Sequence, residues 1–202
     1  QKVLQIGRRL RGNRVRVHVS IGTFIPKPHT PFQWAQADEP EIIQQKQTLL
    51  RRRLFTPGIK VNWSDADPTM FESWSSRGDR RQSAVIHRAW QLGAKFDAWQ
   101  DHFRKEAWLQ AFKENNLDPN FYMHRERQRD EVFPWDHIET GVSKRILRAE
   151  YERSLRGDLR HDCREGCYGC GISQAFATIR AENPSAEWFC PVIPVESESA
   201  NG

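Results

Sequence analysis

The sequence lacks the two features that would place the protein in or across a membrane. No run of about 18 apolar residues is present, so no transmembrane helix is predicted. The stretch Gln1–Leu10 contains no apolar segment of the kind that a signal peptide carries. We therefore expect a soluble, cytoplasmic protein with no membrane partner.

Cysteine is absent from most of the chain, because all four cysteines fall within the last forty residues.

The sequence begins with Gln1 instead of Met, and the helix-like stretch Gln1–Leu10 has neither a cap nor a preceding strand. We therefore expect the chain to be the C-terminal part of a larger polypeptide.

Basic residues outnumber acidic ones. The 31 Lys and Arg against 26 Asp and Glu give a formal net charge of +5, and much of the excess lies in arginine clusters at 8–16, 51–53 and 77–81. Such clusters are able to bind phosphate. Arginine-rich faces are more often solvated or paired with acids, which is the reading that we prefer here.

The first third of the sequence has the pattern of an α/β domain. Strict alternation over Arg14–Ile21 predicts a half-buried strand. A loop stiffened by three prolines follows at Phe24–Trp34. A helix over Asp38–Leu54 and a short strand over Ile59–Trp63 then complete the order strand, helix, strand.

The sequence after Pro68 predicts helices only. They are expected at Met70–Ser76, Arg80–Leu92, Phe96–Glu114 and Val142–Leu155. Within the third helix, aromatic residues at three- and four-residue spacing are expected to line one buried face. These residues are Phe96, Trp99, Phe103, Trp108 and Phe112.

The cysteines carry the sharpest local chemical signal. Cys163, Cys167 and Cys170 lie within eight residues, and Cys190 follows twenty residues later. In a reducing cytosol this spacing favours a metal over a disulfide. Cys190 or His161 would complete a tetrahedral zinc site, whereas three thiolates with an open position suit an iron–sulfur cluster, and the sequence leaves both open.

The spacing of Cys163, Cys167 and Cys170 is also that of the catalytic cluster motif of radical S-adenosylmethionine (SAM) enzymes. In those enzymes the motif follows the first strand of a barrel, whereas only 32 residues follow Cys170 here. We therefore expect these cysteines to form an auxiliary metal site with a structural role.

Other motifs resemble a radical SAM protein near its C-terminal end. They are Phe24–Trp34, Ser76–Arg81, Pro134–Ile138, Gly141–Lys144 and Asp162–Gly171. Together they resemble the C-terminal half of the radical SAM proteins that carry an N-terminal cobalamin-binding domain, over residues 14–172.

This resemblance implies the architecture of the chain. Residues 1–63 would be the last strands of a partial (β/α)6 barrel, residues 64–160 a helical extension, and residues 161–202 a Cys-rich metal-binding tail. The barrel's catalytic 4Fe–4S cluster, most of its SAM site and the cobalamin domain would lie upstream in the same polypeptide. The substrate is unknown, and no catalytic residue is assigned within this chain.

Two groups of side chains are candidates for ligand contacts. The proline-stiffened loop would hold polar groups on a rigid backbone for substrate or SAM, namely Lys27, His29, Thr30 and Gln33. A second group is a candidate anion clamp, namely Arg77, Asp79, Arg80 and Arg81. The alternatives are a structural loop and a helix boundary capped by Asp79, and we prefer the helix boundary slightly.

A second function class accounts for the same residues. The chain would then be a free-standing basic zinc-binding module that recognises RNA or another protein through the cysteine segment and the arginine clusters. The reading frame that precedes Gln1 distinguishes the two, because only the first hypothesis requires an upstream cysteine triad.

Overall fold

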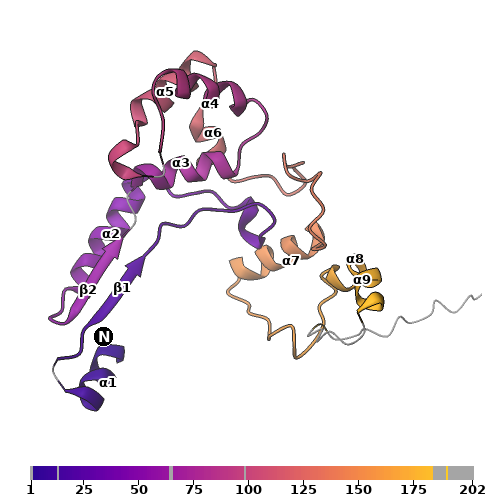
Figure 1. The fold of residues 1–202 in the computed structure, drawn as a ribbon. Helices are drawn as coiled ribbons and strands as arrows, with labels where there is room; N and C mark the ends of the chain where they lie inside the picture. The colour runs from indigo at the N-terminus through magenta and orange to yellow at the C-terminus, as the bar shows by residue number, and fades with distance from the viewer. Residues whose placement is uncertain (1, 13, 64–65, 98, 184–189, 191–202) are drawn as a thin grey trace, which may run out of the picture. The chain divides into compact units, whose positions relative to one another are not determined.

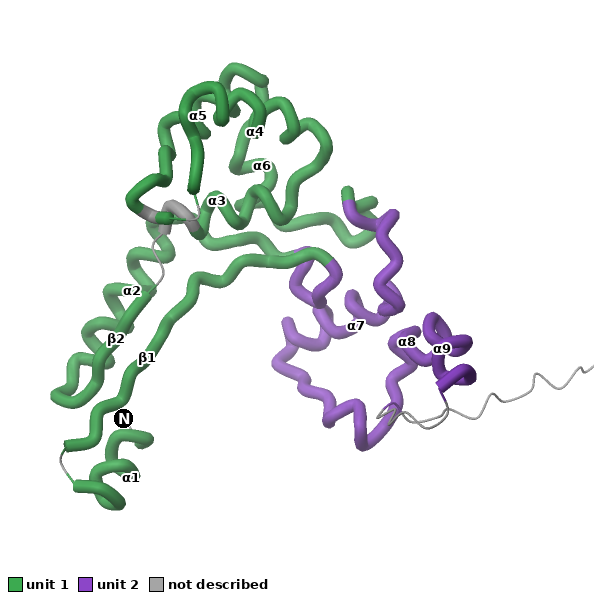
Figure 2. The backbone as a smooth tube through the Cα atoms, viewed as in Figure 1, with its two compact units in different colours: residues 1–28, 35–134 green, residues 29–34, 135–202 purple. Residues whose placement is uncertain are grey.

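The computed structural model describes residues 2–12, 14–63, 66–97, 99–183 and 190, and it divides into two compact units (Figures 1 and 2). Unit 1 comprises residues 1–28 and 35–134, and unit 2 comprises residues 29–34 and 135–202. The predicted boundaries at residues 63 and 160 do not coincide with this division. The proline-rich loop is itself divided, since residues 29–34 pack with the later part of the chain.

Unit 1 begins with a strand–helix–strand segment. Helix α1 (Lys2–Arg11) is followed by strand β1 (Val17–Ile21), helix α2 (Pro40–Leu54) and strand β2 (Ile59–Trp63). The strands pair in parallel with Val17 opposite Ile59, and α2 packs against β2 (Figure 1). The predicted order of these elements is confirmed, although the first strand is three residues shorter than expected at its start.

Both outer edges of this strand pair are open in the described part of the chain, because the sheet contains β1 and β2 only. Parallel strands normally lie inside larger sheets whose faces helices cover. Large apolar side chains also remain exposed beside the pair, including Leu10 at 78% and Phe55 at 91%.

The rest of unit 1 is helical. It contains α3 (Ala66–Ser76), α4 (Gln82–Gln91), the short 3-10 helix η2 (Gln100–His102), α5 (Lys105–Glu114) and α6 (Pro119–Met123). Trp74, Trp108 and Phe112 form the centre of its buried core. The rings of Trp74 and Trp108 lie 5.2 Å apart, and those of Trp74 and Phe112 4.8 Å apart edge to face. Burial of these large rings supplies much of the hydrophobic stabilisation of the unit.

The predicted helix over Phe96–Glu114 is wrong in its first half. The α-helix begins at Lys105, and Phe96 adopts a positive φ of 60°, which a continuous helix does not permit. Trp99 is 62% exposed, so its predicted place in the core is also wrong, whereas burial of Trp108 and Phe112 is confirmed. Helical spacing in the sequence did not reveal that the described residues 96–97 and 99–104 are not α-helical.

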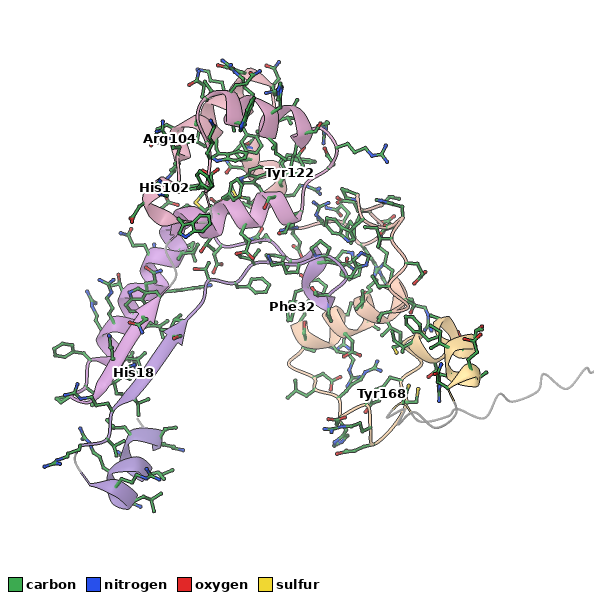
Figure 3. All side chains as sticks on the ribbon, in the orientation of Figure 1. His18, Phe32, His102, Arg104, Tyr122 and Tyr168 are labelled. Atoms are coloured by element: carbon green, nitrogen blue, oxygen red, sulfur yellow. The ribbon has the colours of Figure 1, made fainter. Side chains whose placement is uncertain are left out.

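Unit 2 is built around α7 (Lys144–Leu155), with the short helices η1 (Pro31–Trp34), α8 (Ile172–Ala175) and α9 (Ala177–Glu182). Helix α7 begins two residues later than predicted, after Ser143, whose Oγ accepts a hydrogen bond from Ile146 N. The ring of Tyr151 on α7 stacks on Trp34 and meets Phe32 edge on, and each pair of ring centroids is 6.1 Å apart. Figure 3 labels Phe32 among the side chains of the η1 segment. These rings hold η1 against α7.

The helices are short. Helix α2, the longest in the described part of the chain, has 15 residues. Within that part, no helix combines the length and the apolar character needed to cross a membrane.

Candidate functional site

Unit 2 contains a polar pocket of about 250 Å³ between the η1 segment and the stretch that leads into α7. Its polar lining residues include His29, Gln33, Asp136, Glu139 and Lys144, and its apolar lining residues are Ile138, Val142 and Leu147. A concave site that gathers several polar groups is a candidate for binding a small molecule.

Gln33 is the most enclosed polar residue of this pocket, at 2% exposure. Its Oε1 accepts a hydrogen bond from Trp135 Nε1 at 2.8 Å and another from His29 N at 3.2 Å. Trp135 is itself buried. The two donors fix the Gln33 amide in one orientation.

His29 occupies a strained position beside Gln33. Its φ of 55° lies in the left-handed region, which histidine adopts only occasionally. Its Nε2 is enclosed and has no hydrogen-bond partner in the described part of the chain. His29 therefore combines a strained backbone with a ring nitrogen that lacks a hydrogen-bond partner among the described residues, and both features are typical of a side chain that binds a ligand.

Three charged side chains also line this pocket, namely Asp136, Glu139 and Lys144. Lys144 Nζ forms an ion pair with Asp136. Glu139 Oε1 accepts a hydrogen bond from Gly141 N at 2.6 Å. Lys144 is also the first residue of α7, so the positive end of that helix faces this part of the pocket.

The four predicted contact residues of the loop separate in the structure. His29 and Gln33 line the pocket. Lys27 lies in unit 1 and pairs with Glu72, and Thr30 O accepts the Gln33 N–H at 3.1 Å. The candidate site residues chosen from the sequence did not include Asp136, Glu139 or Lys144, although these residues follow or belong to the Pro134–Ile138 and Gly141–Lys144 motifs.

The predicted anion clamp also separates. Arg77 is 1% exposed, and its guanidinium donates to Met123 O at 3.1 Å and to Arg125 O at 3.3 Å. Met123 is the last residue of α6, so Arg77 donates a hydrogen bond to a carbonyl group that the helix itself leaves without a partner at its C-terminal end. Burial, reinforced by the charges of Arg127 and Arg125, lowers the pKa of Arg77 to about 10. In this position Arg77 ties backbone segments together.

Arg125 and Arg127 share one carboxylate beneath Arg77. Arg125 donates to both Glu131 oxygens at 2.7 and 2.8 Å, and Arg127 donates to Glu131 Oε1 and to Arg77 O, both at 2.9 Å. These contacts, led by the Arg125 hydrogen bonds, lower the pKa of Glu131 to about 2. Arg125, Arg127 and Glu131 form a partly buried ionic network that the sequence analysis missed, because its members are brought together with Arg77 only by α6 and the following loop.

Asp79, Arg80 and Arg81 lie at the turn before α4. Asp79 Oδ1 accepts from Arg81 N at 2.9 Å, and the Arg81 guanidinium pairs with the same carboxylate. The hydrogen bonds from Arg81 lower the pKa of Asp79. Arg80 is exposed. The predicted helix boundary is confirmed, but the predicted cap by Asp79 is wrong, because the N-cap of α4 is Arg81 and no side chain caps this helix. Asp79 instead organises the turn by which the chain enters α4.

The cysteines do not form a ready-made ligand set. Cys163 is exposed, and the other three are half-buried. Cys190 Sγ lies 2.9 Å from Ser173 Oγ, and Gly169 N donates to Cys167 Sγ at 3.4 Å. Among the described residues, no three of the side chains of His, Cys, Asp and Glu converge as a metal site would require. A metal at these thiols requires the segment 161–170 to close around it.

The end of the cysteine segment is anchored beside the pocket. Ser143 N donates to Cys170 O at 2.8 Å. Gly171 has a φ of 108°, and a Cβ there would lie 2.7 Å from Gly141 O. Only glycine permits so close an approach. The cysteine segment and the pocket wall therefore share one backbone junction, which the Gly141–Lys144 and Asp162–Gly171 motifs form.

Comparison with known proteins gives no relative for this chain, since no family model, curated protein or solved structure matches it.

Proposed function

We propose that the chain is the C-terminal part of a cobalamin-binding radical SAM iron–sulfur enzyme, in which it supplies one wall of a ligand pocket and an auxiliary metal site. The observation that carries this proposal is the strand pair β1–β2. The two strands pair in parallel and have open edges among the described residues, and a (β/α)6 barrel is built from parallel strands, so this pair supports the proposal.

The exposed apolar side chains beside the strands support the same proposal. Leu10 on α1 and Phe55 after α2 would be covered if neighbouring barrel elements packed on this segment. Strands contributed by upstream residues of the same polypeptide are the simplest source of that cover. Those residues would also hold the catalytic 4Fe–4S cluster, SAM and cobalamin.

The pocket of unit 2 supports a role in ligand contact. Its residues come from the loop that follows β1 and from the 136–147 segment. Three of the motif segments of the resemblance, Phe24–Trp34, Pro134–Ile138 and Gly141–Lys144, contribute lining residues to this cavity. We assign His29 and Gln33 to ligand contact and Arg77 to structure.

For the cysteine segment we propose metal binding with a structural role. Cys163, Cys167 and Cys170 are joined by turns short enough for one ion, and the junction at Gly171 fixes the end of the segment on unit 2. Binding energy of the metal would then order the residues that precede the junction. Zinc and an iron–sulfur cluster are distinguished by the experiment given in the Discussion.

The test compares the described chain with the same chain preceded by its upstream reading frame. Both proteins are purified anaerobically, supplied with iron and sulfide, reduced and given SAM. We expect 5′-deoxyadenosine from the longer polypeptide only. Its production by the 202-residue chain alone would mean that Cys163, Cys167 and Cys170 bind the catalytic cluster. An upstream frame without a cysteine triad or α/β segments would contradict the proposal and favour the free-standing zinc module.

A further inference from the structure

We infer that the proposed enzyme acts on a small phosphorylated compound, whose phosphate group is held on the polar face of the strand pair β1–β2. This polar face consists of Arg16, directly before β1, His18 and Ser20 on β1, and Lys60 and Asn62 on β2. The inference rests on the proposed function, to which it adds the chemical class of the substrate and the residues that bind it.

The two faces of the strand pair have different surroundings. Ile59, Val61 and Trp63 line a pocket together with Arg51 and Leu54 of α2, and the Arg51 guanidinium lies 4.7 Å from the centroid of the Trp63 ring. Helix α2 therefore covers that face. The residues that alternate with these along each strand point to the other face, and they are exposed.

Three donor side chains lie together on the polar face. His18, which Figure 3 labels, is opposite Lys60 in the parallel register, and neighbouring strands are about 4.8 Å apart. Arg16 lies two residues before His18 on the same side, about 6.6 Å along the chain. The long side chains of Arg16 and Lys60 are able to reach one anionic group between them, to which His18 adds a ring N–H donor. A phosphate group, with three acceptor oxygens, suits three such donors better than a carboxylate with two.

No acidic residue balances the cations of the polar face. Residues 1–37 and 42–64 contain 12 Lys and Arg but no Asp or Glu. Among the described residues neither Arg16 nor Lys60 forms an ion pair, whereas Lys27, Lys46 and Lys144 each pair with a carboxylate. Like charges that lie close together on a sheet destabilise it. A bound anion would remove this repulsion.

The remaining residues of the polar face indicate a compact ligand. Ser20 and Asn62 lie opposite each other, two residues closer to the C-terminal ends of the strands than His18 and Lys60. They offer neutral hydrogen-bonding groups, and the polar face carries no Phe, Tyr or Trp on which the bases of a single-stranded nucleic acid would stack. The phosphate group therefore belongs to a small polar molecule.

The barrel of the proposed function gives this ligand a direction. Helices lie outside the strands of such a barrel, so the face away from α2 would border its interior. Reacting groups lie at the C-terminal ends of barrel strands. A phosphate group at Arg16, His18 and Lys60 would leave the rest of the substrate extending past Ser20 and Asn62 toward those ends.

The test titrates methyl phosphate and acetate into the full chain labelled with ¹⁵N, at about 0.15 M salt. The backbone amide resonances of β1 and β2 are followed. We expect saturable shifts with methyl phosphate, with a Kd on the order of millimolar as befits a fragment. Acetate should bind at least about tenfold more weakly. Equal or tighter binding of acetate, or no saturable shift with methyl phosphate, overturns the inference.

Three variants locate the phosphate group. Arg16→Gln and Lys60→Gln each remove one charged donor and should weaken methyl phosphate binding at least about tenfold. Arg52→Gln removes the same charge from an exposed position on α2 and should leave the affinity unchanged. All three side chains are exposed, so the variants should fold, which the dispersion of their amide spectra checks. Unaltered binding by Arg16→Gln and Lys60→Gln, or an equal loss in Arg52→Gln, contradicts the inference.

A single-stranded oligonucleotide of about ten thymidines tests the competing ligand. Its binding should follow the net charge of the protein, so the three variants should weaken it alike. A loss of at least about tenfold in Arg16→Gln and Lys60→Gln but not in Arg52→Gln would identify the polar face as a nucleic-acid surface and overturn the inference. SAM cleavage by the longer polypeptide is a separate readout, so failure of the phosphate site and failure of the proposed function are distinguishable.

Discussion

Trp135 Nε1 donates a hydrogen bond of 2.8 Å to Gln33 Oε1 across 102 residues of sequence. Both side chains are buried, and this bond joins the end of the proline-rich loop to the segment that leads into α7. The position of one pocket wall therefore depends on an indole ring that does not itself line the pocket.

We expect Trp135→Phe to destabilise unit 2. The variant keeps an aromatic ring but leaves Gln33 Oε1 with one donor, which should lower the free energy of unfolding by about 1–2 kcal/mol. Denaturant unfolding followed by circular dichroism measures the change. Trp99→Phe is the matched control, because Trp99 is 62% exposed. Equal effects of the two substitutions would contradict the buried role of Trp135.

The stability of unit 1 should depend on the buried Trp108 much more than on the exposed Trp99. Trp108 is 7% exposed and lies between Trp74 and Phe71, so Trp108→Ala should cost about 3–5 kcal/mol. Trp99→Ala removes a largely solvated ring and should change the free energy of unfolding much less. A thermal melt of each variant compares them, and an unchanged midpoint for Trp108→Ala would be inconsistent with this core.

Acid should weaken the ionic network of Glu131. Its pKa in the folded chain is about 2, below the ordinary value of 4.5, so its contribution is complete above that ordinary value and is lost as the pH falls toward about 2. Above the ordinary value, this contribution is on the order of 2 kcal/mol. The Glu131→Gln protein should be less stable at neutral pH and lose less stability on acidification, whereas Glu106→Gln, at an exposed position, should follow the unaltered protein. Urea unfolding at a series of pH values measures these profiles.

Substitutions of Arg77 and of Arg80 should have different effects on the free energy of unfolding, although the two residues are only three positions apart. Arg77→Met leaves Met123 O and Arg125 O without their buried donor and should cost about 1–3 kcal/mol, partly offset by relief of repulsion from Arg127. Arg80→Met changes an exposed side chain and should have little effect on stability. If Arg80 bound an anion and Arg77 did not contribute to stability, inorganic phosphate would protect the Arg80→Met protein less than the Arg77→Met protein from thermal unfolding.

Metal content tests the cysteine segment. Protein purified anaerobically without chelator should contain either one zinc per chain and no visible absorption, or iron and sulfide with a broad visible band. Cys167→Ser should lower the metal content and make the segment 161–170 more sensitive to protease, since the metal orders it. Ser173→Ala, next to Cys190 but not a thiol, is the control. Metal-free protein whose tail resists protease equally with and without Cys167 would remove the role proposed for these thiols.

The sequence by itself determined the elements whose signals are local. Alternation predicted β1, and the apolar spacing around Trp108 and Phe112 predicted their burial. The same spacing misled at Trp99, because a helical period in the sequence does not show where a loop with a positive φ interrupts the helix. The resemblance to radical SAM proteins also came from the sequence, and it stays a prediction.

Only the tertiary structure decided which polar side chains meet. His29 and Gln33 were candidates by their place in a stiff loop, but Trp135, which donates to Gln33, and Glu139, which lines the same pocket, lie more than a hundred residues later in the chain. Likewise, no local pattern shows that Arg77 is buried against the end of α6 while Arg80 is exposed. Local propensity acts over a few residues, whereas burial and hydrogen bonding depend on which distant segments pack together.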